Sequence, residues 1–249
     1  TPKARPTTAG TKGTSMTTSL TAAADAIAAA WNYDDPAASE ARFRALLASP
    51  AATDPAYRLE VETQLARTYS LRARFDEALR VLDGVDRELA GRALPRVQVR
   101  ALLERGRCHN SDKRKAEALP LFRQAWDVAR AAQLHGLAVD AAHMVAIAAE
   151  APAEQERWNR EAIAYAKASG DEAALKWLGS LLNNLAWAKH DAGEPEAALA
   201  LFEECLAWHH ARKTGAGEFI ARYSVARCQR TLGRFEQALL LVDHFLAGV

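Results

Sequence analysis

A strict forty-residue period of small residues is the feature that most constrains the fold of this chain. The first series is Ala66, Gly106, Ala146, Ala186 and Ala226, and a second series twelve residues later is Ala78, Ala118, Trp158, Ala198 and Ala238. A fixed period of about 20–50 residues is typical of stacked repeat proteins, in which each unit buries its apolar face against its neighbours. The 249-residue chain is therefore predicted to form one repeat domain rather than one or two globular domains.

The composition predicts an all-helical protein with no nucleic-acid or membrane partner. Ala, Leu, Glu and Arg dominate, and runs of β-branched residues are missing. The 32 basic and 31 acidic side chains nearly cancel, so no overall field would attract nucleic acid or an anionic membrane. No stretch approaches the roughly 18 apolar residues that a membrane helix needs.

The three cysteines, Cys108, Cys205 and Cys228, form no paired pattern. Their odd number argues against a disulfide framework, and their spacing argues against a zinc site. Cys108 and Cys228 occupy the same repeat position, as small buried packing residues would. These features favour a reducing compartment, so a cytoplasmic location is predicted.

Residues 1–16 differ in composition from the rest of the chain. They contain Pro, Thr, Gly and basic residues, no acid and almost nothing apolar, which is typical of disorder. Because Met16 stands at the end of this segment, we interpret residues 1–16 as a disordered leader or the remnant of a tag.

Breakers such as Gly and Pro divide the remaining chain into amphipathic segments of helical length. Pro195 follows Gly193, and Asp171 follows Gly170, as expected where one helix ends and the next begins. The pattern predicts about twelve helices in six antiparallel pairs, with turns so short that each helix packs on the next.

Within these pairs, the small residues have large apolar neighbours at fixed offsets. Around residues 60–90 the set is Leu65, Ala66, Tyr69, Ala78 and Leu82. This pattern resembles the tetratricopeptide repeat, in which a small residue of helix A meets a small residue of helix B so that the helices cross closely. The resemblance implies an all-α fold, an α-solenoid of antiparallel helix pairs wound as a right-handed superhelix.

The period of 40 residues exceeds the 34 that is common in this family, so longer helices are expected. Units of this length resemble those of bacterial regulators and kinesin light chains. One unit departs from the pattern, because Trp158 and Ala162 have exchanged the large and small volumes of helix B. The predicted domain spans residues 17–249, with a degenerate capping pair at 17–50 and repeats at about 59–98, 99–138, 139–178, 179–218 and 219–249.

No catalytic, cofactor or metal site is predicted. The segment from Gly10 to Ser15 lacks the spacing of a phosphate-binding loop. The histidines show no two-ligand spacing on a helix face, and adjacent His209 and His210 would point about 100° apart. Nothing near Glu203 and Glu204 would raise the pKa of one carboxylate, as acid–base chemistry requires. The chain is therefore expected not to be an enzyme.

The resemblance implies that helix A of each repeat lines a concave groove that binds a partner. Carried over by repeat position, the predicted groove residues are Arg67, Arg100, Arg107, His143, Asn183, Asn184, Trp187, Tyr223, Arg227 and Arg230. The same faces carry the acids Glu60, Glu104 and Asp140. Asn183 and Asn184 have poor helix propensity, which suggests that binding rather than folding placed them there.

Two functional hypotheses follow from this groove. The first is a protein–protein interaction scaffold that binds a peptide or partner segment, with acidic character to match the arginines. The second is a regulatory sensor that binds a small anionic or peptide signal in the same groove. A closed pocket around His143, Asn183 and Tyr223 would favour the small ligand, whereas an open trough would favour a polypeptide.

The C-terminal helix, 234–248, is apolar on nearly all sides. A terminal helix of a repeat array needs a polar outer face to stay in solution, and this one has an apolar stripe instead. The sequence therefore predicts that this helix pairs two copies of the chain as a homodimer, or that a native cap is missing.

Overall fold

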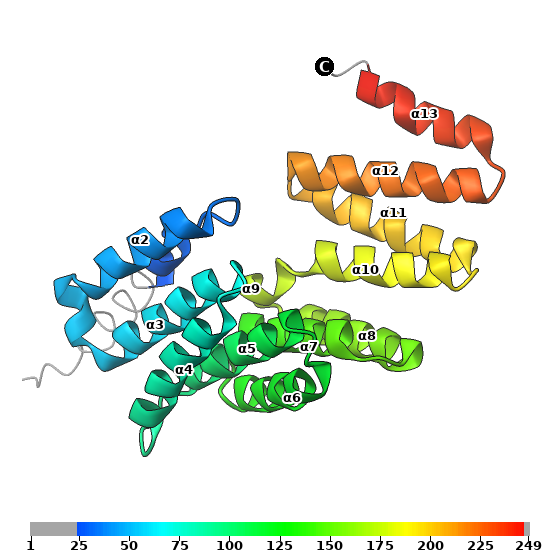
Figure 1. Ribbon diagram of the computed structural model, residues 1–249. Helices are drawn as coiled ribbons and strands as arrows, with labels where there is room; N and C mark the ends of the chain where they lie inside the picture. Colours follow the sequence, from blue (N-terminus) through cyan, green and yellow to red (C-terminus); the bar gives the residue numbers. More distant parts are fainter. Residues whose placement is uncertain (1–23, 247–249) are drawn as a thin grey trace, which may run out of the picture. The chain divides into compact units, whose positions relative to one another are not determined.

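The computed structural model describes residues 24–246, with side chains up to residue 241, and this part of the chain is helical throughout (Figure 1). Residues 24–29 form a first helical segment. Contacts divide the chain into two compact units, Thr1–Arg92 and Ala93–Val249. We call them unit 1 and unit 2 and describe each by itself. The predicted disorder of residues 1–16 lies outside the described residues.

Unit 1 contains the predicted capping pair and the first repeat. Its elements are α2 (Pro36–Leu47), the 3-10 helix η1 (Pro50–Thr53), α3 (Pro55–Ser70) and α4 (Phe75–Leu89). The carboxylates of Asp35 and Asp54 cap α2 and α3 by accepting backbone N–H bonds at 3.0 Å. Helix α3 packs on both α2 and α4.

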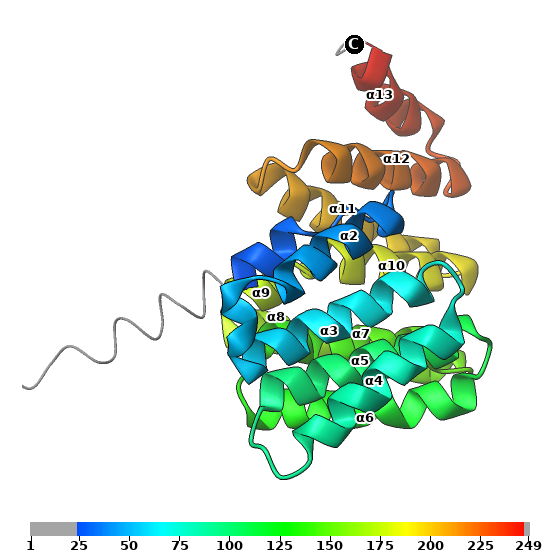
Figure 2. The same ribbon diagram turned by 60° about the vertical axis from the view of Figure 1, so that its left-hand side comes forward.

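Unit 2 contains the other repeats as successive antiparallel helices (Figure 2). These helices are α5 (Pro95–Ser111), α6 (Lys115–Ala131), α7 (His135–Ala148), α8 (Pro152–Ser169), α9 (Glu172–Leu175), α10 (Leu178–Asp191), α11 (Pro195–Ala211), α12 (Gly215–Thr231) and α13 (Phe235–Leu246). Residues 176–177 form a turn that splits one helix A into α9 and α10. Counting the two pieces as one helix, the described residues form the six predicted pairs.

The forty-residue period is built from two half-units of twenty residues. Helices α5, α6, α11 and α12 each contain 17 residues, and three-residue turns follow them. One residue in each of these four turns, and one in each of the turns after α3 and α10, has a left-handed backbone. The six residues are Ala73, Lys113, Gln133, Gly193, Lys213 and Gly233. The next N–H then bonds the carbonyl five residues back, as from Arg114 to His109 at 2.8 Å. Identical helix ends therefore repeat every 20 residues or a multiple of 20.

In four of the five repeats, helix A begins four residues before the predicted start of the repeat. The starts are Pro55, Pro95, His135 and Gly215, against predictions of 59, 99, 139 and 219. At Pro55 and Pro95 the reason is the ring of proline, which fixes the backbone angle of the first helical turn. Residues 95–98, which the prediction assigned to the end of the preceding repeat, are therefore the first turn of α5.

The two series of small residues lie where helices cross. Ala186 and Ala198 are fully buried, and so are Ala78 and Ala118. A Cβ atom added to Gly106 would lie 2.4 Å from the ring of Phe122 on the paired helix. The close helix approach predicted from these positions is confirmed.

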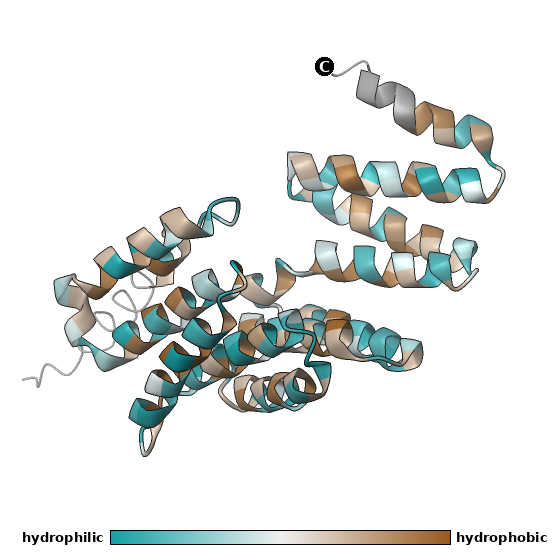
Figure 3. Cartoon of the chain, in the orientation of Figure 1, coloured by the Kyte–Doolittle hydropathy of each residue, from teal (hydrophilic) through white to brown (hydrophobic). Residues whose placement is uncertain are grey.

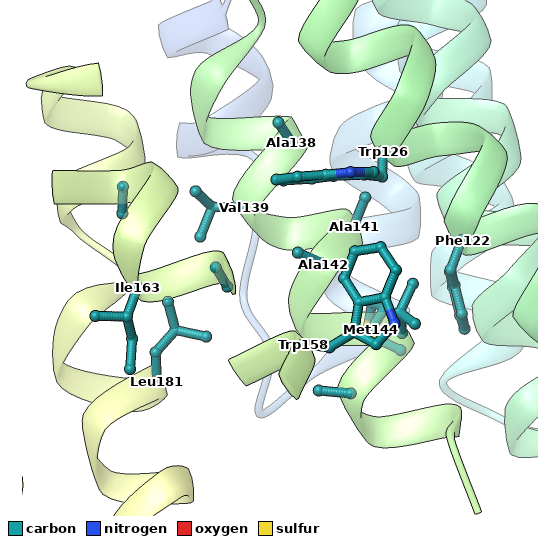
Figure 4. Close-up of a cluster of buried hydrophobic side chains, with 14 of the residues drawn as sticks. Phe122, Trp126, Ala138, Val139, Ala141, Ala142, Met144, Trp158, Ile163 and Leu181 are labelled. Atoms are coloured by element: carbon teal, nitrogen blue, oxygen red, sulfur yellow. The ribbon is translucent and has the colours of Figure 1, made fainter. Parts of the chain in front are cut away.

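The departure at Trp158 is accommodated by a second tryptophan. Trp158 and Trp126 pack edge to face, with ring centroids 5.8 Å apart, against the small residues Ala141 and Ala142 of α7 (Figure 4). Ala162, one turn after Trp158, is fully buried. A large and a small side chain have thus exchanged places while the core stays filled.

Residues 24–246 lack two kinds of feature. None of the helices there is long and apolar enough to cross a membrane. The same residues contain no group of three or more side chains placed to hold a metal ion.

Candidate binding surfaces

The predicted groove residues come from helix A of each repeat, as expected, but lie in both units. Arg67 is half-buried on α3 of unit 1. The other nine lie on α5, α7, α10 and α12 of unit 2. These nine residues lie in different surroundings within unit 2.

Arg107 is held by ion pairs within unit 2. Its guanidinium lies 2.8 Å from the carboxylate of Glu104 and forms a second ion pair with Asp140 of α7. The three side chains are only 11%, 2% and 7% exposed. Buried carboxylates need a counter-charge, which explains the pairing. Arg107 is therefore a member of a buried ion-pair cluster, and its role as a groove residue stays a prediction.

His143 is also a packing residue. Its ring lies 5.4 Å from the ring of Trp177. Burial lowers the pKa of His143, and the nearby Asp140 only partly opposes this. The imidazole is therefore neutral near pH 7 and is unsuited to bind an acidic partner.

Arg100 lines a pocket of about 370 Å³ in unit 2. Arg96, His135 and Trp177 contribute to the same wall, although none of the three is among the predicted residues. The two acids of the pocket are already engaged, because Asp140 pairs with Arg107 and Asp171 caps α9. A sequence signal existed for Trp177, which stands forty residues after Leu137, another lining residue.

Trp187 and Arg227 form a second cluster, across α10 and α12. The Arg227 guanidinium lies over the Trp187 ring, 5.0 Å from its centroid. Trp187 is half-buried against Phe202, while Asn184 on the same helix is exposed. Asn183 is half-buried, and its Oδ1 has no hydrogen-bond partner in the described part of the chain.

Tyr223, Arg227 and Arg230 meet in a groove of about 290 Å³ between α12 and α13. We call it the terminal groove, and its lining residues are Tyr223, Ala226, Arg227, Arg230, Phe235, Ala238 and Leu239. Figure 3 shows the hydrophobic positions of these two helices in brown. Phe235 and Leu239 are not among the predicted site residues, although the apolar character of the C-terminal helix did single out this region.

The arginines of the terminal groove differ from nearby arginines in whether a carboxylate pairs with them. Arg222 pairs with Glu218, and Arg234 pairs with Glu196. Among the described side chains, neither Arg227 nor Arg230 has a carboxylate partner, and both are exposed. Two cations are thus available to a ligand at this end of unit 2.

The cysteines are packing residues, as the repeat pattern predicts. All three are buried, and none of them forms a disulfide among the described residues. Burial raises the pKa of the Cys205 thiol to about 11, and it raises the pKa of Cys228 as well. The thiolate is the reactive form, so neither thiol is activated.

Comparison with known proteins connects this architecture to one family. Residues 178–209, which span α10 and most of α11, match the family model "Tetratricopeptide repeat". Among curated proteins, no sequence match was found. The match covers one repeat and confirms the resemblance on which the groove residues were predicted.

Solved structures similar to the chain are tetratricopeptide-like helical proteins. A Podosopora anserina putative kinesin light chain with nearly identical TPR-like repeats is 21% identical, with a TM-score of 0.59 over 76% of this chain and 94% of that one. BtubC (BKLC) from P. vanneervenii is 17% identical, with a TM-score of 0.61 over 90% and 89%. The apo quorum sensor NprR from B. thuringiensis is 14% identical, with a TM-score of 0.63 over 85% and 59%. These likenesses confirm the all-α solenoid fold.

Proposed function

We propose that this chain, a protein of tetratricopeptide-like repeats, is a non-enzymatic binding module for a polypeptide segment with acidic character. The proposed surface is formed by α10 and α12 of unit 2. One observation carries the proposal: Arg227 stacks on Trp187 and shares the terminal groove with Arg230, and both arginines are exposed without a carboxylate partner among the described side chains.

The chemistry of this surface suits an extended or helical peptide. Arginine binds a carboxylate through two parallel N–H donors, which gives geometric specificity as well as affinity. The exposed amide of Asn184 can donate to and accept from a peptide backbone. Trp187 and Tyr223 offer large, rigid contact areas, and such residues are frequent at binding hot spots.

Two proteins of similar fold are consistent with this proposal. A Rap protein, with a TM-score of 0.57 and 12% identity, was solved in complex with competence and sporulation factor. NprR is described as a quorum sensor. The fold therefore occurs in proteins that receive a signal or a partner, and the ligand of this chain is inferred only from its own residues.

A sensor for a small anionic signal is the second candidate, and the Arg100 pocket is the observation that favours it. The three residues proposed to enclose a small ligand lie in different surroundings, however. His143 packs on Trp177, Asn183 is half-buried on α10, and Tyr223 lines the terminal groove. This separation favours the polypeptide ligand over the small one.

Fluorescence anisotropy tests the proposal with a labelled twelve-residue peptide rich in Glu and Leu, compared with a version in which Gln replaces Glu. We expect the acidic peptide to bind and the neutral one to bind at least about tenfold more weakly. The double variant Arg227→Ala with Arg230→Ala should lose about tenfold or more in affinity.

Arg157→Ala with Arg160→Ala is the matched control, because these two arginines are also exposed and three residues apart but lie on α8. The control should bind the acidic peptide like the parent chain. Equal losses in the two double variants would refute the proposed surface.

Homodimerisation through helix 234–248 stays a prediction. Phe235, Leu239 and Leu240 are 62%, 61% and 69% exposed, as an unpaired apolar stripe would be. Residues 242–248 lie outside the described side chains. Light scattering on the parent chain and on Leu240→Glu with Leu241→Glu tests this prediction: if the parent chain is a dimer, the double variant should convert it to a monomer.

A further inference from the structure

In the terminal groove, a member of the small-residue series is less buried than its equivalents in other repeats. Ala238 is only half-buried, whereas the equivalent Ala78, Ala118 and Ala198 are fully buried. Leu239 is 61% exposed, whereas Leu199, forty residues earlier, is 6% exposed. The same repeat position is therefore covered in one pair of helices and open in the next.

The preceding pair, α10 and α11, shows what fills this position. Val225 and Cys228 of α12 lie in one buried cluster with Ala186, Ala198 and Leu199 of that pair. The Cys228 thiol also donates a hydrogen bond to the Pro195 carbonyl at 3.2 Å. The slot between helices A and B of a repeat is thus filled by an amphipathic helix that presents two medium-sized apolar residues three positions apart.

The polar contacts of α12 define the rim of the same slot. Arg227 lies over Trp187, and the Thr231 hydroxyl lies 3.0 Å from the His190 imidazole. Forty residues after Trp187 and His190 stand Arg227 and Arg230. A helix docked in the terminal groove would therefore place its positions equivalent to 227 and 231 against Arg227 and Arg230.

We propose that the terminal groove receives an amphipathic helix of a partner protein, in the same way that the α10–α11 slot receives α12. The partner helix has apolar residues at positions n and n+3, and carboxylates at n+2 and n+6 that pair with Arg227 and Arg230. This inference rests on the proposed function in taking the ligand to be an acidic polypeptide, and it adds the conformation and the residue spacing of that ligand.

The rim charges favour a partner over a second copy of this chain. In a two-fold contact through the terminal groove, each copy brings Arg227 and Arg230 toward the same pair on the other copy. Neither arginine has a carboxylate partner among the described side chains to offset that repulsion. Carboxylates on a different protein complement the rim, whereas a second copy repeats its charge.

The test uses a probe peptide with the sequence of Gly215–Thr231 carrying Arg227→Glu and Thr231→Glu. A side-chain crosslink on its outer face holds the helix, because isolated helices of this length are marginal in water. The control peptide keeps Arg227 and Thr231. Anisotropy should show that the acidic probe binds the parent chain at least about tenfold more tightly than the control peptide.

Protein variants locate the binding. Leu239→Glu should weaken the acidic probe about tenfold or more, and Ile147→Glu, an exposed apolar residue of α7, should leave it unchanged. Melting curves show whether each variant stays folded, which is expected because both side chains are exposed. The inference would be overturned if the acidic probe and the control peptide bound with equal affinity, or if Leu239→Glu left the affinity for the acidic probe unchanged.

The outcomes separate this inference from the proposed function. If the twelve-residue acidic peptide binds through Arg227 and Arg230 but the crosslinked helical probe does not, the inference fails and the proposed function stands. If neither ligand binds, both fail. If light scattering finds a dimer that Leu239→Glu converts to a monomer, a second copy occupies the groove, and the inference is overturned.

Discussion

The helix-A faces of α5 and α12 use the same repeat position in opposite ways. Arg107 and Arg227 are separated by 120 residues, which is three periods. Arg107 is 11% exposed and held by two carboxylates, one of them Glu104 three residues earlier. Arg227 is exposed, and the residue three positions before it is Ser224. Repeat position therefore decides where an arginine lies, and the neighbouring charges decide whether it supports the fold or faces a ligand.

The largest expected effect is the loss of stability when Arg107, the buried arginine of this comparison, is removed. Arg107→Ala removes the positive charge that pairs with two buried carboxylates, so we expect a loss of about 3–5 kcal/mol in the free energy of unfolding. Arg227→Ala removes an exposed side chain and should stay within about 0.5 kcal/mol. Urea unfolding of the two variants measures both values. Similar losses at the two positions would contradict the distinction.

Ala186→Trp tests the helix crossing that both faces share. Ala186 is fully buried, and overpacking such a site typically costs about 1–3 kcal/mol. Ala197→Trp on α11 is the control, because Ala197 is exposed and one position away from the buried Ala198. The melting temperature should fall clearly for the first variant and little for the second. If both fall equally, the assigned repeat register is wrong.

The buried face should also respond to pH through His143. Burial lowers the pKa of this imidazole in the folded protein, so the unfolded chain binds the proton more tightly. Stability should therefore fall as the pH drops below about 6.5, the ordinary pKa of histidine. His143→Gln should flatten this part of the stability–pH curve. An unchanged slope would show that His143 is not buried in its neutral form.

The smallest expected change in stability comes from the turns before and after α12. Lys213 has a left-handed backbone with φ of 53°, whereas Gly233 occupies the equivalent site at the other end of the helix. Lys213→Gly should stabilise the chain by a few tenths to about 1 kcal/mol, because glycine adopts this conformation without strain. Gly233→Lys should have the opposite sign. Thermal unfolding measures both.

The fold was largely predictable because its determinants are local and periodic. The series through Ala186 and Ala198 fixed the helix pairs, and the breakers fixed the turns. The twenty-residue half-unit was less visible, because four of the six left-handed turn residues are not glycine. The predicted right-handed superhelix of one continuous domain remains a prediction, since the two units are described separately.

The site was less predictable because it depends on contacts between distant residues. The pairing of Arg107 with Asp140 joins side chains 33 positions apart on different helices. Repeat position assigned Tyr223, Arg227 and Arg230 to one helix face, but it could not show that Phe235 and Leu239 line the same groove. Comparing Glu104 with Ser224 would have distinguished the two arginines from the sequence.

One measurement tests the central claim most directly. In a proton–nitrogen correlation spectrum, the six tryptophan side chains report on separate places in the molecule, and Trp187→Phe assigns one signal to Trp187. Titration with the acidic peptide should shift the Trp187 indole signal and leave that of Trp126, which is 4% exposed, unchanged. A shift of the Trp177 indole signal, with the Trp187 signal unchanged, would contradict the proposed surface and would place the ligand in the Arg100 pocket, which Trp177 lines.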